Sequence, residues 1–181
     1  QGIIATDAPG GFGNRDVALD ARVSGGAGDI NILSETGKVY GVIYAKNEGT
    51  GQINITTGLV ELLTSVSTPT GPAITVRTGN TTGDVSLRTT DQVTAYIGPQ
   101  YGYLISTLDL TAIDIQNLGV GKTELTIEGD VSASRAIKVD HSADGALNIT
   151  TASGTTVTSA NGNGIFATNT GSAASYIKTD G

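Results

Sequence analysis

The segment Gln52-Ile53-Asn54-Ile55 alternates polar and apolar residues, the period of a β-strand with one buried face. Close copies of this four-residue pattern recur along the chain at 29–32, 84–87, 124–127 and 146–149. Two of the intervals between copies are nearly equal and the other two are longer, which is typical of a repeat unit that carries insertions. The repeat is therefore built from strands, because a helical repeat would show apolar spacings of three and four.

Each copy has two companion segments with the same alternation, one upstream and one downstream. The upstream segments contribute the apolar pairs Leu19/Ala21, Ile43/Ala45, Ile74/Val76, Ile113/Ile115, Ile137/Val139 and Ile165/Ala167. The downstream segments are weaker and contribute Val39, Val60/Leu62, Val93/Ala95, Val131/Ala133 and Val157. We therefore predict an all-β fold, a right-handed parallel β-helix, which is a three-stranded solenoid of about five to six turns. The right hand is taken from the common form of this fold.

The alternation also assigns residues to the two faces of the central strand. A second inward ladder is predicted at Ser34, Thr57, Thr89, Gly129 and Thr151, and the outward ladder at Asn31, Asn54, Ser86, Thr126 and Asn148. In this register Asp84 and Glu124 lie one turn apart on the outside, where two carboxylates could hold a cation. The simpler interpretation, which we favour, is that both carboxylates stay hydrated.

Composition limits the classes of function. The chain of 181 residues has 26 glycines, no cysteine, methionine or tryptophan, 15% charged residues and a formal net charge of −7. Lysine and arginine are scattered, so no basic stripe exists to bind nucleic acid. No apolar run approaches the length of about 20 residues that a membrane helix requires, so we expect no membrane insertion by this segment. The mean hydropathy of +0.02 indicates enough apolar residues for a core.

Two segments carry a family resemblance. Asn161-Gly-Asn-Gly-Ile-Phe-Ala-Thr-Asn-Thr-Gly171 and the Gly-Ala-Leu-Asn-Ile-Thr-Thr run at 145–151 resemble repeats in the passenger domains of AIDA-type bacterial autotransporters. The resemblance covers most of the chain and weakens in residues 1–15 and 96–111. It implies a secreted or surface-displayed protein of a Gram-negative bacterium that is exported through an outer-membrane barrel. It also implies that residues 1–181 are a single β-helix fragment of a longer passenger domain.

Three motifs invite a cofactor or metal site but fit a turn better. Gly119-Val-Gly-Lys-Thr123 lacks the earlier glycine and the following helix of a phosphate-binding loop. Gly25-Gly-Ala-Gly-Asp29 occurs once, whereas calcium-binding nonapeptides need tandem copies. The single His141 follows a strand and has no second histidine or cysteine near it in sequence, so we expect a solvated turn residue. We predict no cofactor and no metal.

A parallel β-helix can be a polysaccharide-degrading enzyme, so the carboxylates on the first strand matter. Its outward ladder is predicted to contain Asp20 and Asp114, three turns and about 14 Å apart at ladder spacing. A glycosidase needs its two carboxyl groups about 5–9.5 Å apart. Asp114 and the neighbouring Lys138 are expected to form a cross-strand ion pair. We therefore predict no catalytic residues and no enzymatic activity.

Two insertions, at 64–72 and 96–111, interrupt the repeat. The second insertion carries Tyr96, Tyr101 and Tyr103, three of the six tyrosines. Insertions into a solenoid emerge as loops on one face, and tyrosine is enriched at interfaces. These three tyrosines are the predicted binding residues. The alternative is that apolar residues of the same segment fold it back over an edge of the core; these are Ile97, Leu104, Ile105, Leu108 and Leu110.

Together these observations favour a non-enzymatic passenger that acts in adhesion or host-surface binding. The expected partner is a host cell-surface protein or glycan, or another copy of the chain. The alternative is a released virulence effector that binds and activates one host receptor. A polysaccharide-processing β-helix enzyme is the third possibility. Adhesion predicts binding spread over the ladders, whereas receptor engagement predicts binding that depends on a few loop residues.

Overall fold

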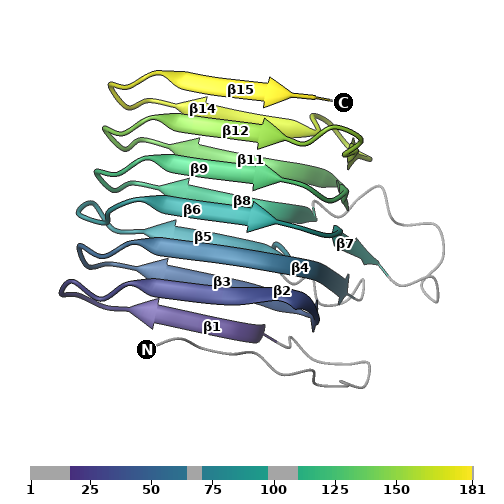
Figure 1. Ribbon diagram of the computed structural model, residues 1–181, viewed down its shortest axis with the longest axis horizontal. Coiled ribbons are helices and arrows are strands. Elements are labelled where there is room, and N and C mark those ends of the chain that lie inside the picture. The colour runs from purple at the N-terminus through teal and green to yellow at the C-terminus, as the bar shows by residue number, and fades with distance from the viewer. Residues whose placement is uncertain (1–16, 65–70, 98–109, 181) are drawn as a thin grey trace.

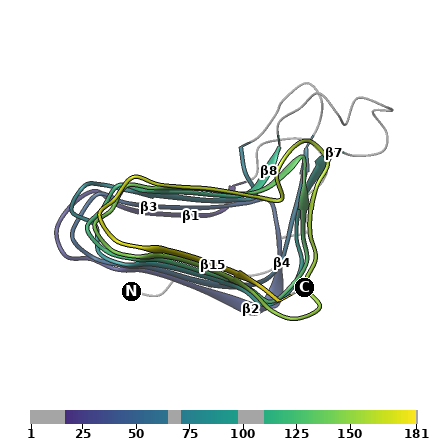
Figure 2. The same cartoon turned by 90° about the horizontal axis from the view of Figure 1, so that it is seen from above.

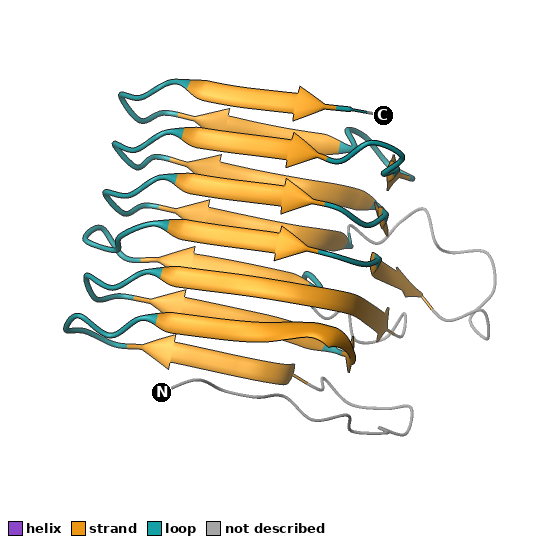
Figure 3. Ribbon diagram, viewed as in Figure 1, coloured by secondary structure: helices purple, strands orange, loops and turns teal. Residues whose placement is uncertain are grey.

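The structure is a computed structural model that describes residues 17–64, 71–97 and 110–180. In these three ranges the chain forms strands and short connections, with no helix (Figure 3). Every strand pairing is parallel. The prediction of an all-β protein with parallel strands is thus confirmed.

The strands form two sheets. The first has six strands in the order β1 (Val17–Val23), β3 (Val42–Asn47), β5 (Ile74–Thr78), β8 (Thr111–Asn117), β11 (Arg135–His141) and β14 (Ile165–Asn169). The larger sheet follows the order β13 (Val157–Ser159), β10 (Val131–Ala133), β7 (Val93–Ile97), β4 (Ile53–Thr64), β6 (Val85–Thr89), β9 (Thr123–Ile127), β12 (Leu147–Thr151) and β15 (Ser175–Thr179). Strand β2 (Ile30–Tyr40) also pairs with β4.

The larger sheet has two parts because β2 and β4 run through both. The first half of β4 pairs with β6, and its second half pairs with β7. Viewed from above, the chain runs along the six-stranded sheet, then along the two parts of the larger sheet in turn, and then back to the six-stranded sheet (Figure 2). We call one such circuit a pass and the second part of the larger sheet the third face. Successive passes stack from β1 to β15 (Figure 1).

The core lies between the sheets and is supplied by alternate residues of each strand. The six-stranded sheet aligns the apolar pairs predicted for it, from Leu19/Ala21 through Ile43/Ala45 to Ile165/Ala167. On the third face, Val60 aligns with Val39 and Val93 on its two neighbouring strands. Val93 aligns in turn with Val131, and Val131 with Val157. The inward side chains of the middle passes are fully buried. Ile74, Ile113 and Ile137, for example, are 0% exposed. The predicted ladders of these two faces are confirmed.

The predicted register of the central strand is wrong at one pass. Thr123, not Leu125, aligns with Val85 and Leu147, so Leu125 aligns with Leu87 and Ile127 with Thr89. Ile127 therefore holds the inward position that was assigned to Gly129. The sequence pattern misled because Thr123 is polar, yet it is fully buried and hydrogen-bonded inside the stack. The outward ladder consequently contains Glu124 where Thr126 was expected.

Glycine is required where the connection from the six-stranded sheet to the larger sheet turns, because the backbones of successive passes touch there. A Cβ atom on Gly49 would lie 2.2 Å from the Gly26 carbonyl oxygen, and one on Gly171 would lie 1.8 Å from that of Ala143. No side chain fits at those distances. The spacing between passes therefore requires glycine at positions 49 and 171.

Both insertions leave from a different corner, the one between the third face and the six-stranded sheet. The backbones of Thr64 and Ile97, the last residues of β4 and β7, are paired on adjacent passes. The chain re-enters the six-stranded sheet at β5 and β8. In two other passes the same corner is a single residue, Gly41 or Ser134, and between β13 and β14 it spans residues 160–164. The longest connections of the chain thus leave from this corner.

Candidate functional site

Tyr96, the first of the predicted binding residues, lies on β7 in the third face. It is half-buried, and its backbone pairs with Leu63 of β4. Its hydroxyl donates a short hydrogen bond to the Glu61 carboxylate. The other two predicted binding residues, Tyr101 and Tyr103, lie outside the described residues. The structure therefore places Tyr96 beside a carboxylate that the sequence did not single out.

Glu61 connects Tyr96 with a second tyrosine. The backbone of Glu61 pairs with that of Tyr40 on β2, in the pass below, and side chains at paired positions of neighbouring strands point to the same face. Tyr40 is 51% exposed. Tyr40, Glu61 and Tyr96 thus form one cluster on the outside of the third face, which we call the Tyr–Glu patch. The predicted Val39/Val60 register already places Tyr40 beside Glu61, so strict alternation could have found this pair.

The hydrogen bond to Glu61 changes the acidity of Tyr96. It raises the pKa of Tyr96 to about 12, with smaller contributions in the same direction from partial burial and from the charges of Glu61 and Tyr40. The cause is that a phenolate beside the carboxylate would lose a donated hydrogen bond and gain a repulsion. Tyr96 therefore stays protonated over the physiological range and holds Glu61 in place.

The surroundings of the patch are apolar and poor in cations. Leu59 and Leu63, the two outward neighbours of Glu61 on β4, are half-buried. Lys38 is exposed on the adjoining strand β2 but makes no ion pair with Glu61. Within the described ranges Glu61 is therefore a carboxylate with a tyrosine donor and no countercharge.

The patch lies on the same strands from which the insertions leave. Thr64 and Ile97 end β4 and β7, three residues after Glu61 and one after Tyr96. At the far side of the second insertion, Leu110 is buried in the core. The burial of Leu110 agrees with the alternative in which apolar residues of the insertion fold back over an edge of the core. Residues 98–109 lie outside the described part of the chain.

A buried polar column runs up the inside of the stack at the end of the six-stranded sheet. Its members occupy equivalent positions in successive passes: Asn47, Thr78, Asn117, His141 and Asn169. The three asparagines each accept a backbone N–H two residues on, from Gly49, Gly119 and Gly171, at 2.8–2.9 Å. This column was not predicted from the sequence. Its signal is the Asn-x-Gly triplet that recurs at 47–49, 117–119 and 169–171.

His141 belongs to this column, so its prediction as a solvated turn residue is wrong. It is only 1% exposed. Its Nε2 lies 2.7 Å from the carbonyl oxygen of Gly145, which can only accept, so Nε2 carries the proton. Its Nδ1 lies 2.9 Å from the Thr123 hydroxyl, which also accepts a hydrogen bond from Asn117 Nδ2. The imidazole is thereby a buried, structural member of the column.

The hypothesis of a cation between Asp84 and Glu124 is wrong because the two residues do not occupy paired positions: Glu124 pairs with Ser86. Asp84 aligns with Lys122, whose backbone N–H donates to Asp84 Oδ1 at 3.0 Å. The Lys122 ammonium lies 2.8 Å from Glu124 Oε2 and neutralises it. The described residues contain no cluster of three or more His, Asp, Glu or Cys side chains suited to a metal.

The carboxylates of the six-stranded sheet are also paired, though not as predicted. Asp114 binds Arg77, with Oδ2 2.5 Å from Nη2, instead of Lys138. Lys138 pairs within its own strand with Asp140 at 2.6 Å, and Asp20 pairs with Arg22 at 2.7 Å. The Lys138 prediction is wrong because side chains two apart on one strand share a face and compete with cross-strand neighbours. Each carboxylate here already has a cationic partner.

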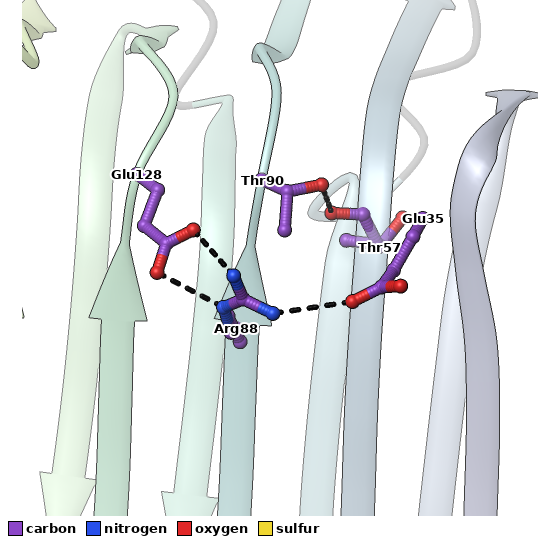
Figure 4. Close-up of polar contacts among 5 residues, drawn as sticks. All are labelled: Glu35, Thr57, Arg88, Thr90 and Glu128. Atoms are coloured by element: carbon purple, nitrogen blue, oxygen red, sulfur yellow. Dashed lines mark hydrogen bonds and ion pairs between the residues drawn. The ribbon is translucent and has the colours of Figure 1, made fainter.

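Arg88 makes the widest ion network of the larger sheet (Figure 4). Its guanidinium contacts both carboxylate oxygens of Glu128, at 2.9 and 2.8 Å, and Glu35 Oε1 at 3.1 Å. Arg88 lies on β6, with Glu128 just after the neighbouring strand β9 on one side and Glu35 on β2, beyond β4, on the other. This guanidinium hydrogen-bonding lowers the pKa of Glu128. Arg88 ties passes together and gives both carboxylates a cationic partner, which Glu61 lacks.

The glycine-rich motifs lie in turns, as predicted. Residues 118–122 connect β8 to β9 with no helix, and residues 24–29 connect β1 to β2. Asp29 Oδ1 accepts the backbone N–H of Gln52 from the next pass at 2.8 Å. No helix in the described part of the chain has the length and apolarity to span a bilayer.

The chain was also compared with known proteins. No protein-family model, curated protein or solved structure matches it.

Proposed function

We propose that this chain is a length of right-handed parallel β-helix, three strands to the turn, from the passenger of a Gram-negative autotransporter. It acts without catalysis, in adhesion or host-surface binding, and is secreted or displayed at the cell surface. The observation that carries this proposal is the Tyr–Glu patch on the side of a stiff parallel stack. Tyrosine-rich patches supply large contact area at low entropic cost.

The second candidate is a released effector that engages one host receptor. It is favoured by the concentration of features at one place: the patch and the two points where the insertions leave share β4 and β7. A distributed adhesin would instead use the outward ladders of Asn31, Asn54 and Ser86, which are small and polar. The enzyme alternative draws no support from the ion-paired carboxylates.

The test is binding of the fluorescently labelled chain to a panel of epithelial and immune cell lines and to a glycan array. We expect saturable cell binding. Alanine replacement of Tyr96, Tyr101 and Tyr103 should abolish it if one receptor is engaged through this region, whereas alanine at Asn31, Asn54 and Ser86 should reduce it if the ladders bind. Absence of binding to every cell line and glycan would refute the proposal.

A further inference from the structure

The Glu61 carboxylate is fixed in place and only partly used. Its strand is paired on both sides, with Tyr40 below and Thr94 above. Oε1 accepts the hydrogen bond from Tyr96, and no contact of Oε2 is seen among the described residues. A preorganised carboxylate with a free oxygen is an acceptor for a charged donor, and charge-assisted bonds are the strong ones.

The lack of a countercharge distinguishes Glu61 from the other acidic side chains of the described strands, each of which has a cationic partner. Asp20, Glu48 and Asp114 each lie within 2.7 Å of a lysine or arginine nitrogen, and Glu128 lies within 2.8 Å. Glu61 has no such partner among the described residues. Because the whole chain carries a formal charge of −7, its unmatched carboxylates favour a cationic ligand.

Two tyrosine rings flank this carboxylate. Tyr40 is one strand spacing away, about 4.8 Å between backbones, and is half-exposed. Tyr96 is near enough that Tyr40 contributes to its raised pKa. Aromatic faces attract ammonium and guanidinium groups, and the chain already shows this contact elsewhere, with Arg22 stacked 4.9 Å above the Tyr44 ring.

The apolar neighbours select among cations. Leu59 and Leu63 are half-buried beside Glu61, so the patch offers aliphatic contact next to its charge. Lysine and arginine side chains bury their methylene stems along apolar surface while the charged head makes polar contacts. A sugar would need several polar groups, but the Tyr96 hydroxyl is engaged and the Thr94 hydroxyl is buried.

We propose that the Tyr–Glu patch binds an arginine or lysine side chain of a protein partner. Glu61 pairs with the cation, the Tyr40 ring packs on it, and Tyr96 positions Glu61. This proposal rests on the proposed function in that it takes the partner to be a protein, and it names the chemistry by which that partner is recognised.

The experiment is a titration of the ¹⁵N-labelled chain with Nα-acetyl-arginine methylamide, followed by amide chemical shifts. We expect shifts centred on Tyr40, Glu61 and Tyr96, and none with the neutral analogue Nα-acetyl-citrulline methylamide or with a methyl glycoside. Glu61→Gln keeps an acceptor for Tyr96 but removes the charge, and should weaken binding about five-fold or more. Tyr40→Leu, which breaks no hydrogen bond made by Glu61, should weaken it similarly.

Matched controls lie elsewhere on the stack. Glu48→Gln removes a carboxylate that already pairs with Lys46, and Tyr176→Leu removes a tyrosine that is 54% exposed on β15. Both should bind the arginine probe as the unmodified chain does. Equal binding by Glu61→Gln, or glycoside shifts at the patch in place of arginine shifts, would overturn the proposal. Cell binding by the unmodified chain without arginine binding would refute this inference and leave the proposed function standing; the reverse result would refute the function alone.

Discussion

The imidazole Nδ1 of His141 lies 2.9 Å from the Thr123 hydroxyl of the pass below, and both side chains are buried. Each residue is unexpected from the sequence, since Thr123 interrupts an apolar ladder and His141 is the single histidine of the chain. Together they satisfy each other, with Asn117 and Gly145 completing the chain of hydrogen bonds. Buried polar groups are tolerated when they are bonded in this way.

We expect His141→Asn to be nearly neutral and His141→Leu to be destabilising. Asparagine occupies the same column in three other passes, so its amide suits this position. Leucine would remove the hydrogen bond to the Gly145 carbonyl and one of the two made by the Thr123 hydroxyl, at a cost of about 2–3 kcal/mol of unfolding free energy. Urea denaturation of the two variants measures this difference. Equal loss in both would show that the column does not tolerate asparagine here.

Charge placed inside the stack should be far more harmful than charge placed outside. Ile55 and Leu87 are at most 2% exposed, whereas Asn54 and Ser86 point outward. Ile55→Asp or Leu87→Asp should lower the unfolding free energy by more than about 3 kcal/mol, because the buried charge has no partner. Asn54→Asp and Ser86→Asp, one residue away, serve as controls and should stay within about 1 kcal/mol. Similar melting temperatures for inward and outward variants would contradict the register.

The glycine corner should reject a single methyl group. Gly49→Ala would bring Cβ to 2.2 Å from the Gly26 carbonyl oxygen, so the backbones must separate, which costs about 2–3 kcal/mol. Gly25→Ala is the matched control, because its added Cβ meets nothing within 4 Å. Thermal melts of both variants test the difference. A stable Gly49→Ala variant would mean that the passes are spaced more widely than the structure shows.

The contact between Tyr96 and Glu61 predicts an alkaline transition. The folded-state pKa of Tyr96 is raised to about 12, above the value of about 10 in the unfolded chain. The stability contributed by this contact is therefore fully present below pH 10 and is lost as the pH rises from about 10 to about 12. Ultraviolet titration should show that Tyr96 ionises at a higher pH than an ordinary tyrosine, and Glu61→Gln should move the pKa of Tyr96 back toward its ordinary value. An unchanged titration curve in that variant would argue against the hydrogen bond.

The ion network of Arg88 predicts an acid-side effect. Its hydrogen bonds hold the pKa of Glu128 below the ordinary value, so their contribution is present at neutral pH and is lost as the pH falls through the lowered pKa. Arg88→Ala should therefore melt lower than the unmodified chain at pH 7 but not at pH 2–3. The difference should also shrink at about 1 M salt, because exposed ion pairs are screened. A pH-independent difference would assign the role of Arg88 to packing instead.

Apolar alternation predicted the strands and the parallel pairing of two faces, because Ile and Val at every second position are typical of a strand with one buried face. It failed where a polar side chain is buried, at Thr123 and His141, since their partners lie on other passes and no local pattern shows them. The candidate site was half predicted. Tyr96 was chosen for its residue type, whereas Glu61 and Tyr40 required the register between strands.

The placement of both long insertions at one corner separates added length from the architecture of the sheets. The glycine corner and the polar column fix the chain where the six-stranded sheet ends, and the connections there are all short, at five or six residues. At the corner that follows the third face, one pass turns within Gly41 while the next departs after Thr64 and returns at Ile74. Segments spliced in at this corner leave the alignment of neighbouring strands intact. Related chains can therefore diversify the surface next to the Tyr–Glu patch while inheriting an unchanged scaffold.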